Sequence, residues 1–230
     1  MARMTQLPSP DEKAASVTAM FDAIAPRYDL VNRVMTFGLD RGWRRETVAS
    51  LALSPGSRVL DIACGTGDLC RELLKSRLNA FGVDMSAGML RKAHTSAPIF
   101  QGDALALPVS DGGLDGATCG FALRNVADLP KLFAEMARVV RSEGRIALLE
   151  VDQPRSKLLR AGHGIYFRKV VPLIGGILSD GDAYRYLPAS TVYLPSADGL
   201  MTMLAQAGFT SLRRRVFGLG AAQLITGTRA

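Results

Sequence analysis

Residues 59–68 combine a carboxylate with a glycine-rich turn, a pattern that can hold a charged ligand. An apolar run ends at Asp61 and breaks into a turn that carries Gly65 and Gly67. Apolar residues at helical spacing follow at once, so the segment predicts a strand, a turn and a helix. Glycine lets the backbone approach a ligand closely and adopt positive φ without strain. We therefore expect this turn to form one wall of a binding site.

The turn differs from a dinucleotide-binding fingerprint, which needs a third glycine three residues after Gly67. Cys70 stands at that position. The carboxylate of Asp61 would also repel a pyrophosphate at the end of the strand. A cationic ligand suits the turn better, and S-adenosylmethionine carries both a sulfonium and an ammonium group. The alternative is that the glycines form a plain loop.

Polar side chains stand at the ends of the other predicted strands, where open α/β sheets bind their ligands. Asp84 ends the second strand, and its carboxylate could accept hydrogen bonds from both hydroxyls of a ribose. It could equally supply a negative charge to the start of a helix capped by Ser86. Asp103 follows the third strand, where it would face an adenine amino group or serve as a turn residue. The Arg124-Asn125 pair follows the fourth strand.

Strands that alternate with helices predict an α/β protein with a parallel sheet and crossover connections. The predicted strands are 58–62, 80–83, a short one near 99, 114–120, 145–151, 211–217 and 223–228. The predicted helices are 16–50 with breaks near Pro26 and Gly38, 67–77, 86–94, 129–141 before Gly144, and 197–207. Residues 1–13 are expected to form a loose tail.

These elements divide the chain into four consecutive parts. We expect an N-terminal helical cap at 1–50 and an α/β core that binds the cofactor at 51–152. A helical substrate insertion at 153–195 interrupts the alternation, and residues 196–230 complete the core sheet. A chain of 230 residues is long enough for one such domain with a full core.

Cysteine and histidine usage argues against a metal site. The three cysteines and two histidines do not form a cluster with the spacing of metal ligands, so no metal is expected. An odd number of cysteines fits a reducing cytoplasm. The first twenty residues lack the apolar stretch of a signal peptide. The longest apolar run, at 170–178, is too short to span a bilayer.

The net charge of +7 leaves three interpretations open, namely compositional bias, an anionic membrane surface, and nucleic acid. Nucleic acid is disfavoured because no basic strip rich in aromatic residues is present. The segment 155–178 interleaves five basic residues with apolar ones. That pattern suits a membrane interface and an isoprenoid tail, or a helical lid packed on the sheet.

Several longer motifs resemble the ubiquinone/menaquinone biosynthesis C-methyltransferases, a family of class I S-adenosylmethionine enzymes. They are Met20–Asp29, Trp43-Arg44, Gly65–Asp68, Gly102–Ala104 with Leu107-Pro108, Gly120–Val126, Val171–Gly175 and Tyr184–Ser190. The similarity covers about 16–229. It implies a doubly wound Rossmann-like α/β fold, with a seven-stranded, mostly parallel sheet, a C-terminal antiparallel strand and a helical substrate lid.

The resemblance also implies the residues of the site. The cofactor-binding positions would be Asp61, Gly65, Thr66, Gly67, Asp84, Met85, Asp103, Ala104 and Gly120. The catalytic positions would be Arg124, Asn125 and Tyr28. Two positions depart from the family pattern. The family often has Asn where this chain has Asp103, and a residue with a hydroxyl group where this chain has Gly120. Gly120 offers only its backbone for the contact at that position.

The implied reaction transfers a methyl group from a sulfonium to a ring carbon of a reduced quinone. A quinol hydroxyl titrates near about 10, and ionising it makes the neighbouring carbon nucleophilic. Arg124 cannot act as a base, because guanidinium stays protonated, but it can stabilise the phenolate. Asn125 would orient the hydroxyl or a water, and Tyr28 would join that network. The base is not identified, with His163 one candidate.

The implied substrate is a prenylated quinol, either demethylmenaquinol or a benzoquinol of the ubiquinone pathway. We expect a cytoplasmic enzyme with peripheral contact to the inner face of the membrane, no nucleic-acid partner, and a homodimer as an allowed assembly. One alternative is a methyltransferase for another small aromatic or lipid. Another is a scaffold that binds the cofactor without catalysis, which the intact Arg124-Asn125 pair argues against.

Overall fold

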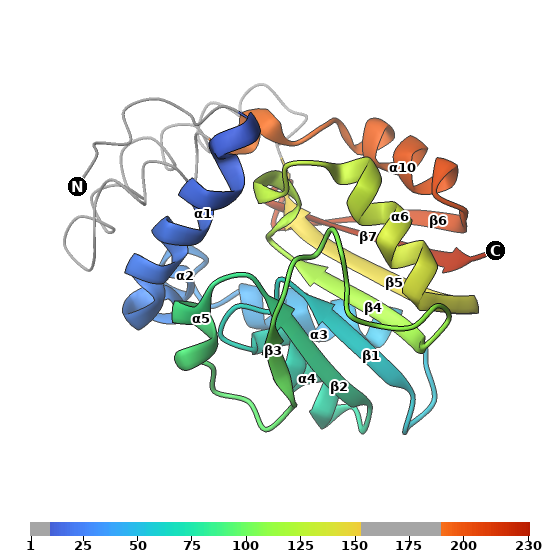
Figure 1. Ribbon diagram of the computed structural model, residues 1–230, viewed down its shortest axis with the longest axis horizontal. Coiled ribbons are helices and arrows are strands. Elements are labelled where there is room, and N and C mark those ends of the chain that lie inside the picture. Colours follow the sequence, from blue (N-terminus) through green and yellow to red (C-terminus); the bar gives the residue numbers. More distant parts are fainter. Residues whose placement is uncertain (1–9, 153–189) are drawn as a thin grey trace.

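The computed structural model describes the backbone of residues 10–152 and 190–230, in which seven strands form a single sheet (Figure 1). The strands are β1 (Arg58–Ile62), β2 (Asn79–Asp84), β3 (Ile99–Gln101), β4 (Leu114–Gly120), β5 (Val140–Val151), β6 (Phe209–Phe217) and β7 (Ala222–Arg229). Their spatial order is β3-β2-β1-β4-β5-β7-β6, and β7 runs antiparallel to both of its neighbours. The predicted doubly wound sheet with an antiparallel C-terminal strand is confirmed. The predicted lid lies outside the described residues.

The described helices cover both faces of the sheet and its carboxyl edge. They are α1 (Pro10–Ile24), η1 (Ala25–Arg27), α2 (Tyr28–Met35), α3 (Asp40–Ser50), α4 (Asp68–Lys75), α5 (Ala87–Arg91), η2 (Leu123–Asn125), α6 (Leu129–Val139), η4 (Ser190–Tyr193) and α10 (Ala197–Gln206). Helices α6 and α10 pack on one face, and α3 and α4 pack on the other. The parallel strands end towards α1 and α2 (Figure 1).

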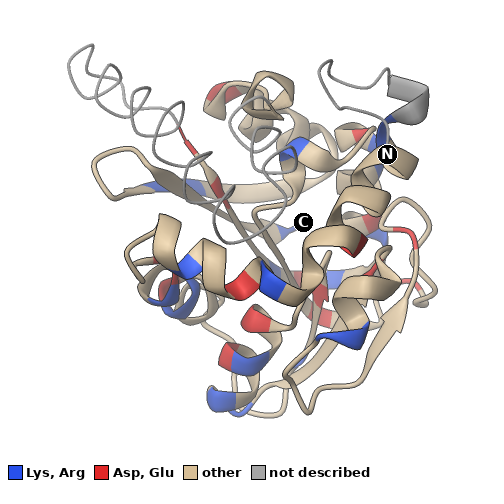
Figure 2. Ribbon diagram, turned by 90° about the vertical axis from the view of Figure 1, so that its left-hand side faces the viewer, with Lys and Arg blue, Asp and Glu red and all other residues tan. Residues whose placement is uncertain are grey.

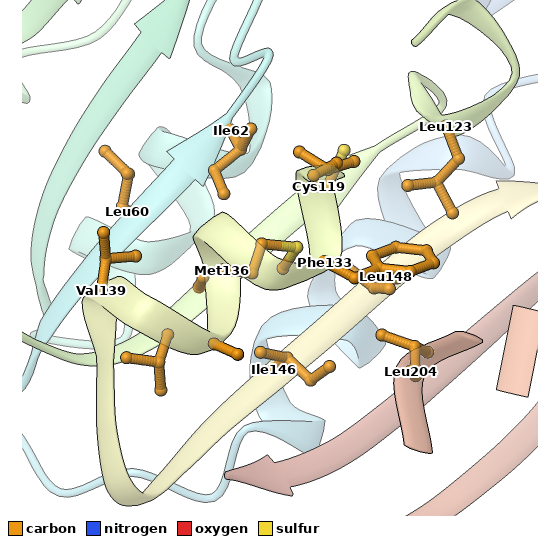
Figure 3. Packing of buried hydrophobic residues seen from close by; sticks show 14 of the residues in the cluster. Leu60, Ile62, Cys119, Leu123, Phe133, Met136, Val139, Ile146, Leu148 and Leu204 are labelled. Atoms are coloured by element: carbon orange, nitrogen blue, oxygen red, sulfur yellow. The ribbon is translucent and has the colours of Figure 1, made fainter. Parts of the chain in front are cut away.

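Alternation along the strands divides the core between these two faces, since successive side chains of a strand point to opposite sides. Figure 3 shows Phe133 and Met136 of α6 packed over Ile146 and Leu148 of β5. Ala147, between those two strand residues, belongs to the opposite cluster with α3 and α4. Both clusters are built from buried apolar side chains, so the sheet is a rigid platform for the loops at its carboxyl edge.

Two local predictions are wrong. Residues 10–13 belong to α1 and not to a tail, because proline is tolerated in the first turn of a helix. Lys13 anchors this end by donating a hydrogen bond from Nζ to the carbonyl of Val126 at 2.9 Å. Helix α6 ends at Val139, and Gly144 lies inside β5 and does not terminate the helix.

The carboxylates of Asp22 and Asp29 connect the N-terminal helices to the core through hydrogen bonds. Asp22 Oδ1 accepts hydrogen bonds from Ser86 Oγ at 2.5 Å and from the backbone N–H of Gly88 at 2.7 Å, both at the start of α5. Asp29 Oδ1 accepts a hydrogen bond from Thr66 Oγ1 in the glycine turn at 2.6 Å. The segment from α1 to α2 is therefore held over the carboxyl ends of the strands.

Candidate active site

Two adjoining cavities open at the carboxyl edge of the sheet. The first has a volume of about 150 Å³ and lies between α1 and the loops that follow β1, β2, β3 and β4. The second has a volume of about 260 Å³ and lies between α2, α3, η2 and the turn between β6 and β7. Tyr28 and Phe121 line both cavities, so these two side chains form the boundary between them.

The first cavity is lined by most of the predicted cofactor residues. They are Gly65, Asp84, Met85, Asp103, Ala104 and Gly120, accompanied by Tyr28 and Asn125 from the predicted catalytic set. The charged side chains among its described lining residues are two carboxylates, Asp84 and Asp103. This wall favours a ligand that carries positive charge over one that carries a pyrophosphate.

Asp84 joins the glycine turn to the start of α5. Its Oδ2 accepts the backbone N–H of Gly65 and its Oδ1 accepts that of Ser86, both at 2.8 Å. Ser86 in turn caps α5 by accepting a hydrogen bond from the backbone N–H of Met89 at 3.0 Å. Burial raises the pKa of Asp84, while these N–H groups oppose the rise. Each carboxylate oxygen keeps acceptor capacity for a ligand hydroxyl, so both sequence interpretations of Asp84 are compatible with this geometry.

The three residues Gly65, Thr66 and Gly67 of the glycine turn differ in their position relative to the first cavity. Gly65 and Gly67 both have positive φ, at +55° and +83°. Gly65 lines the first cavity, whereas Thr66 and Gly67 lie outside its wall. A Cβ on Gly67 would stand 2.7 Å from Thr95 Cγ2, so glycine is needed there for packing as well as for conformation.

Asp61 is buried behind this turn, with 1% of its surface exposed, and does not line either cavity. Its Oδ1 accepts a hydrogen bond from Thr118 Oγ1 at 2.8 Å, and Cys70 Sγ lies 3.7 Å from its Oδ2. Burial raises the pKa of Asp61 to about 7. Asp61 therefore lies behind the described walls of the two cavities, and its role in cofactor binding stays a prediction.

Arg124, which lines the second cavity, forms an ion pair that the sequence did not predict. Arg124 is 5% exposed and pairs through Nη1 with Oε1 of Glu150, which is 1% exposed at the end of β5. Arg124 Nη1 also donates to the carbonyl of Phe121 at 2.8 Å, and Nε donates to Ser190 Oγ at 3.2 Å. The charge of Arg124 is thus compensated, and its guanidinium ties together three segments that are distant in sequence.

A second buried guanidinium lies on the same cavity. Arg44 of α3 pairs with Asp40 and also with Asp68 Oδ2 at 3.1 Å, at the start of α4. Its guanidinium carbon lies 5.6 Å from the centre of the Phe121 ring. Burial raises the pKa of Tyr28, and the nearby charge of Arg44 opposes the rise. The sequence indicated Arg44 only as part of a motif, because its partner Asp68 comes from another helix.

Asn125 and Gly120 are two further residues that the sequence analysis placed in the site. Asn125 Oδ1 is buried on the first cavity and has no hydrogen-bond partner among the described residues, which leaves an acceptor for a ligand donor. A Cβ on Gly120 would lie 2.8 Å from Leu69 Cδ1, so the hydroxyl residue of the family pattern would need Leu69 to move. His163 lies outside the described residues.

The described residues contain neither a cluster of metal ligands nor a helix that could span a membrane. No group of three or more His, Cys, Asp or Glu side chains within 10–152 and 190–230 could hold a metal ion. In the same ranges, no helix combines the length and the apolar character that a bilayer crossing requires.

Comparison with known proteins gives consistent results. The profile of the ubiE/COQ5 methyltransferase family matches residues 9–229. The chain is 46% identical to a demethylmenaquinone methyltransferase of Roseiflexus castenholzii, over 97% of each chain, and 45% identical to one of a Roseiflexus species, over 98% of each. It is 38% identical to a ubiquinone/menaquinone biosynthesis C-methyltransferase of Geotalea daltonii, over 95% of this chain and 98% of that one.

Solved structures share the fold at lower sequence identity. A possible histamine N-methyltransferase of Thermotoga maritima has a TM-score of 0.66 and 20% identity, covering 92% of this chain and 99% of that chain. Phosphoethanolamine N-methyltransferase 2 of Haemonchus contortus, in complex with S-adenosyl-L-methionine, has a TM-score of 0.61 and 14% identity. That match covers 82% of this chain and 52% of the other.

We predict that Asp84→Asn weakens binding of S-adenosylmethionine by about ten- to a hundredfold, because it removes charge-assisted hydrogen bonds of about 1.5–3 kcal/mol each. Isothermal titration calorimetry measures the change. Asp128→Asn is the matched control, since Asp128 also accepts a backbone N–H, from Lys131 at 2.9 Å, but does not line the first cavity. Equal affinities in the two variants would remove Asp84 from the binding site.

We also predict a pH effect from Asp61. Its pKa of about 7 in the folded protein exceeds the ordinary aspartate pKa of 3.8, so between these pH values the unfolded chain loses a proton that the folded protein keeps. Stability therefore falls as pH rises from about 4 to about 7, by at most about 4 kcal/mol. In Asp61→Asn this contribution should vanish, which urea denaturation at several pH values will show. Identical pH slopes in wild type and variant would contradict the assignment.

Proposed function

The chain belongs to the ubiE/COQ5 methyltransferase family, and on that basis we propose that it methylates a ring carbon of demethylmenaquinol. It is an S-adenosylmethionine-dependent methyltransferase of quinone biosynthesis, with S-adenosyl-L-methionine as its cofactor. The naphthoquinol substrate is favoured by the names of the two Roseiflexus relatives, which share about 45% of their sequence with this chain. A benzoquinol of the ubiquinone pathway is the second candidate, because the Geotalea relative carries both pathways in its name.

The observation that carries the proposal is the pairing of two unlike cavities across Tyr28 and Phe121. The first offers Asp84 and Asp103 to a cationic ligand, and it offers Oδ1 of Asn125, which has no partner among the described residues, to a donor. Bound S-adenosylmethionine supplies a methyl group already activated by its sulfonium. The residues present therefore fit this cofactor in the first cavity.

The second cavity fits an aromatic, hydroxylated ring. Its wall contains Trp43, Phe37 and Phe121 for the ring faces, with Arg44 and Arg124 at its buried end. Both guanidinium groups already have carboxylate partners, so they act as fixed donors and do not make the cavity strongly cationic. Preorganised donors of this kind stabilise a developing phenolate more than a neutral hydroxyl.

The quinol proton needs an acceptor, and Asp40 is the carboxylate that the described residues place on the second cavity. Its Oδ1 accepts a hydrogen bond from Thr36 Oγ1 at 2.8 Å, and Arg44 holds it in place. We assign Asp40 as this acceptor, with Arg44 and Arg124 stabilising the phenolate. As the hydroxyl proton moves to Asp40, the neighbouring ring carbon becomes nucleophilic. Its new bond to the methyl carbon would form as the bond between that methyl and the sulfur breaks, which leaves the donor as a neutral thioether. The methylated ring carbon then releases its hydrogen as a proton, and the ring becomes aromatic again. Much of the rate then comes from holding the two reactants in line.

The prenyl tail of the proposed substrate connects the reaction with the membrane. A prenyl chain partitions into lipid because each buried CH₂ contributes about 0.8 kcal/mol. We propose that the enzyme works in peripheral contact with the cytoplasmic face of the membrane, where such a substrate is available.

Product analysis tests the function. Purified protein is incubated with methyl-labelled S-adenosylmethionine and either a short-tail demethylnaphthoquinol or the matching benzoquinol, under reducing conditions. We expect the label on a ring carbon of the naphthoquinol, which mass spectrometry and NMR identify. Label on an oxygen, or no transfer to either quinol, would contradict the proposal.

The same assay applied to two variants tests the role of Arg124. Arg124→Met should lower turnover by about 10²–10³ and stability by about 3–5 kcal/mol, because Glu150 is left buried and unpaired. Arg124→Met/Glu150→Leu should recover most of the stability and none of the turnover. If the double variant regains turnover together with stability, Arg124 serves the fold alone.

A further inference from the structure

Large apolar side chains occupy strained turns at the second cavity. Phe37, Phe121 and Leu219 have φ of +52°, +58° and +57°, a region in which bulky residues are outliers. Phe37 and Phe121 line the second cavity, and Leu219 follows Gly218, which also lines it. Phe121 is half-buried and forms the partition between the cavities. Phe37 and Leu219 are instead 77% and 79% exposed.

Further exposed apolar side chains extend this feature. On α2, the exposed side chains of Leu30 and Val34 lie four residues apart and so share one face of the helix, while Asn32 and Met35 line the cavity. Such an apolar face would normally be buried. Phe37, which also lines the cavity, follows in the turn after α2. We define the apolar rim as Leu30, Val34, Phe37, Leu39, Val192 and Leu219.

The members of the apolar rim belong to the segments that form the wall of the second cavity, and Phe37 and Leu39 line it directly. These members come from α2, the turn between α2 and α3, η4, and the turn between β6 and β7, and each of these segments contributes a lining residue. Trp43 of α3 stacks on Phe217 at 6.3 Å with the ring planes 14° apart, which fixes the β6–β7 turn against α3. The segments that carry the rim are therefore held against one another at the second cavity.

Basic residues flank the rim on the same elements. Arg33 of α2 and Arg41 and Arg45 of α3 are exposed, and Arg215 pairs with Glu46 at 2.6 Å beside α3. The charges are mixed on the side of the molecule that Figure 2 shows, with acidic residues between the basic ones. Apolar contact therefore dominates any docking here, with arginines at its edge to meet anionic headgroups.

We propose that the apolar rim docks this enzyme on an anionic lipid bilayer, with the mouth of the second cavity opening directly into the lipid. This inference rests on the proposed function, because it gives the prenyl tail a path from the ring site into the membrane. It also explains why Phe37 and Leu219 hold conformations that glycine or asparagine would adopt with less strain. Phenylalanine and leucine at these positions place apolar side chains against the lipid, whereas a turn with glycine or asparagine would have no apolar side chain there.

The test removes rim residues that do not line the cavity. The variant Leu30→Gln/Val34→Gln/Leu219→Asn leaves Phe37 and Leu39 in place, and asparagine relieves the strain at position 219. Its melting temperature should equal or exceed that of the wild type. Co-sedimentation with phosphatidylglycerol/phosphatidylcholine vesicles should weaken at least tenfold. Turnover of a long-tail quinol in those vesicles should fall at least tenfold, while turnover of a soluble short-tail quinol stays unchanged.

Arg77→Asn is the matched control. Arg77 also has positive φ, at +60°, and precedes β2 at the opposite edge of the sheet. It should bind vesicles as the wild type does.

Three results would overturn docking through the rim. In the first, the wild type does not bind anionic vesicles at low salt. In the second, the triple variant binds them as strongly as the wild type does. In the third, the wild type is a dimer and the triple variant is a monomer. The last would identify the rim as an interface between copies. Failure of the wild type on the soluble quinol would instead overturn the proposed function, so the two failures are distinguishable.

Discussion

The wall between the two cavities depends on the buried ion pair between Arg124 and Glu150. Through it, the loop after β4 is joined to the end of β5, and Ser190 is drawn to the same guanidinium. The hydrogen bond from Arg124 to the carbonyl of Phe121 holds that residue in its left-handed turn, with the ring between the cavities. Breaking such a pair leaves an uncompensated charge in the interior, so the site and the local fold are coupled. A lysine in place of Arg124 could not reproduce these divergent contacts, since it lacks the planar fork.

The N-terminal helices complete the site from the other side. Asp22 and Asp29 connect them to α5 and to the glycine turn, and Tyr28 between these carboxylates contributes to both cavities. The strand ends alone would form an open cleft. With α1 and α2 added, the same residues enclose a donor site and an acceptor site that share one boundary, which suits direct transfer between two bound molecules.

Local signals explain what could be predicted from the sequence. The strands at 58–62 and 114–120 have the predicted limits, because an apolar run followed by a turn is a short-range pattern. Asp84 and Asp103 could be placed on the cavity because the carboxyl ends of parallel strands meet at one edge. The cap at Ser86 followed from the same kind of local rule.

Other features depend on contacts between distant segments and could not be predicted. Glu150 ends an apolar strand, a signal like that of Asp61, yet only the fold shows that its partner is Arg124. The same applies to Arg44, whose partner Asp68 starts another helix. Asp61 itself shows the limit of the pattern, because alternation along β1 turns its side chain away from the cavity towards Cys70 and Thr118.

The central claim is that donor and acceptor occupy separate cavities that meet at Tyr28 and Phe121. A crystal structure of the protein with S-adenosylhomocysteine and a short-tail naphthoquinol tests it most directly. The account predicts the ribose at Asp84 in the first cavity and the quinol ring in the second. The ring carbon should face the sulfur across the boundary, close enough for a methyl group to lie about 3–3.5 Å from that carbon. A quinol ring bound on the far side of the first cavity, or away from Arg124 and Arg44, would contradict the account.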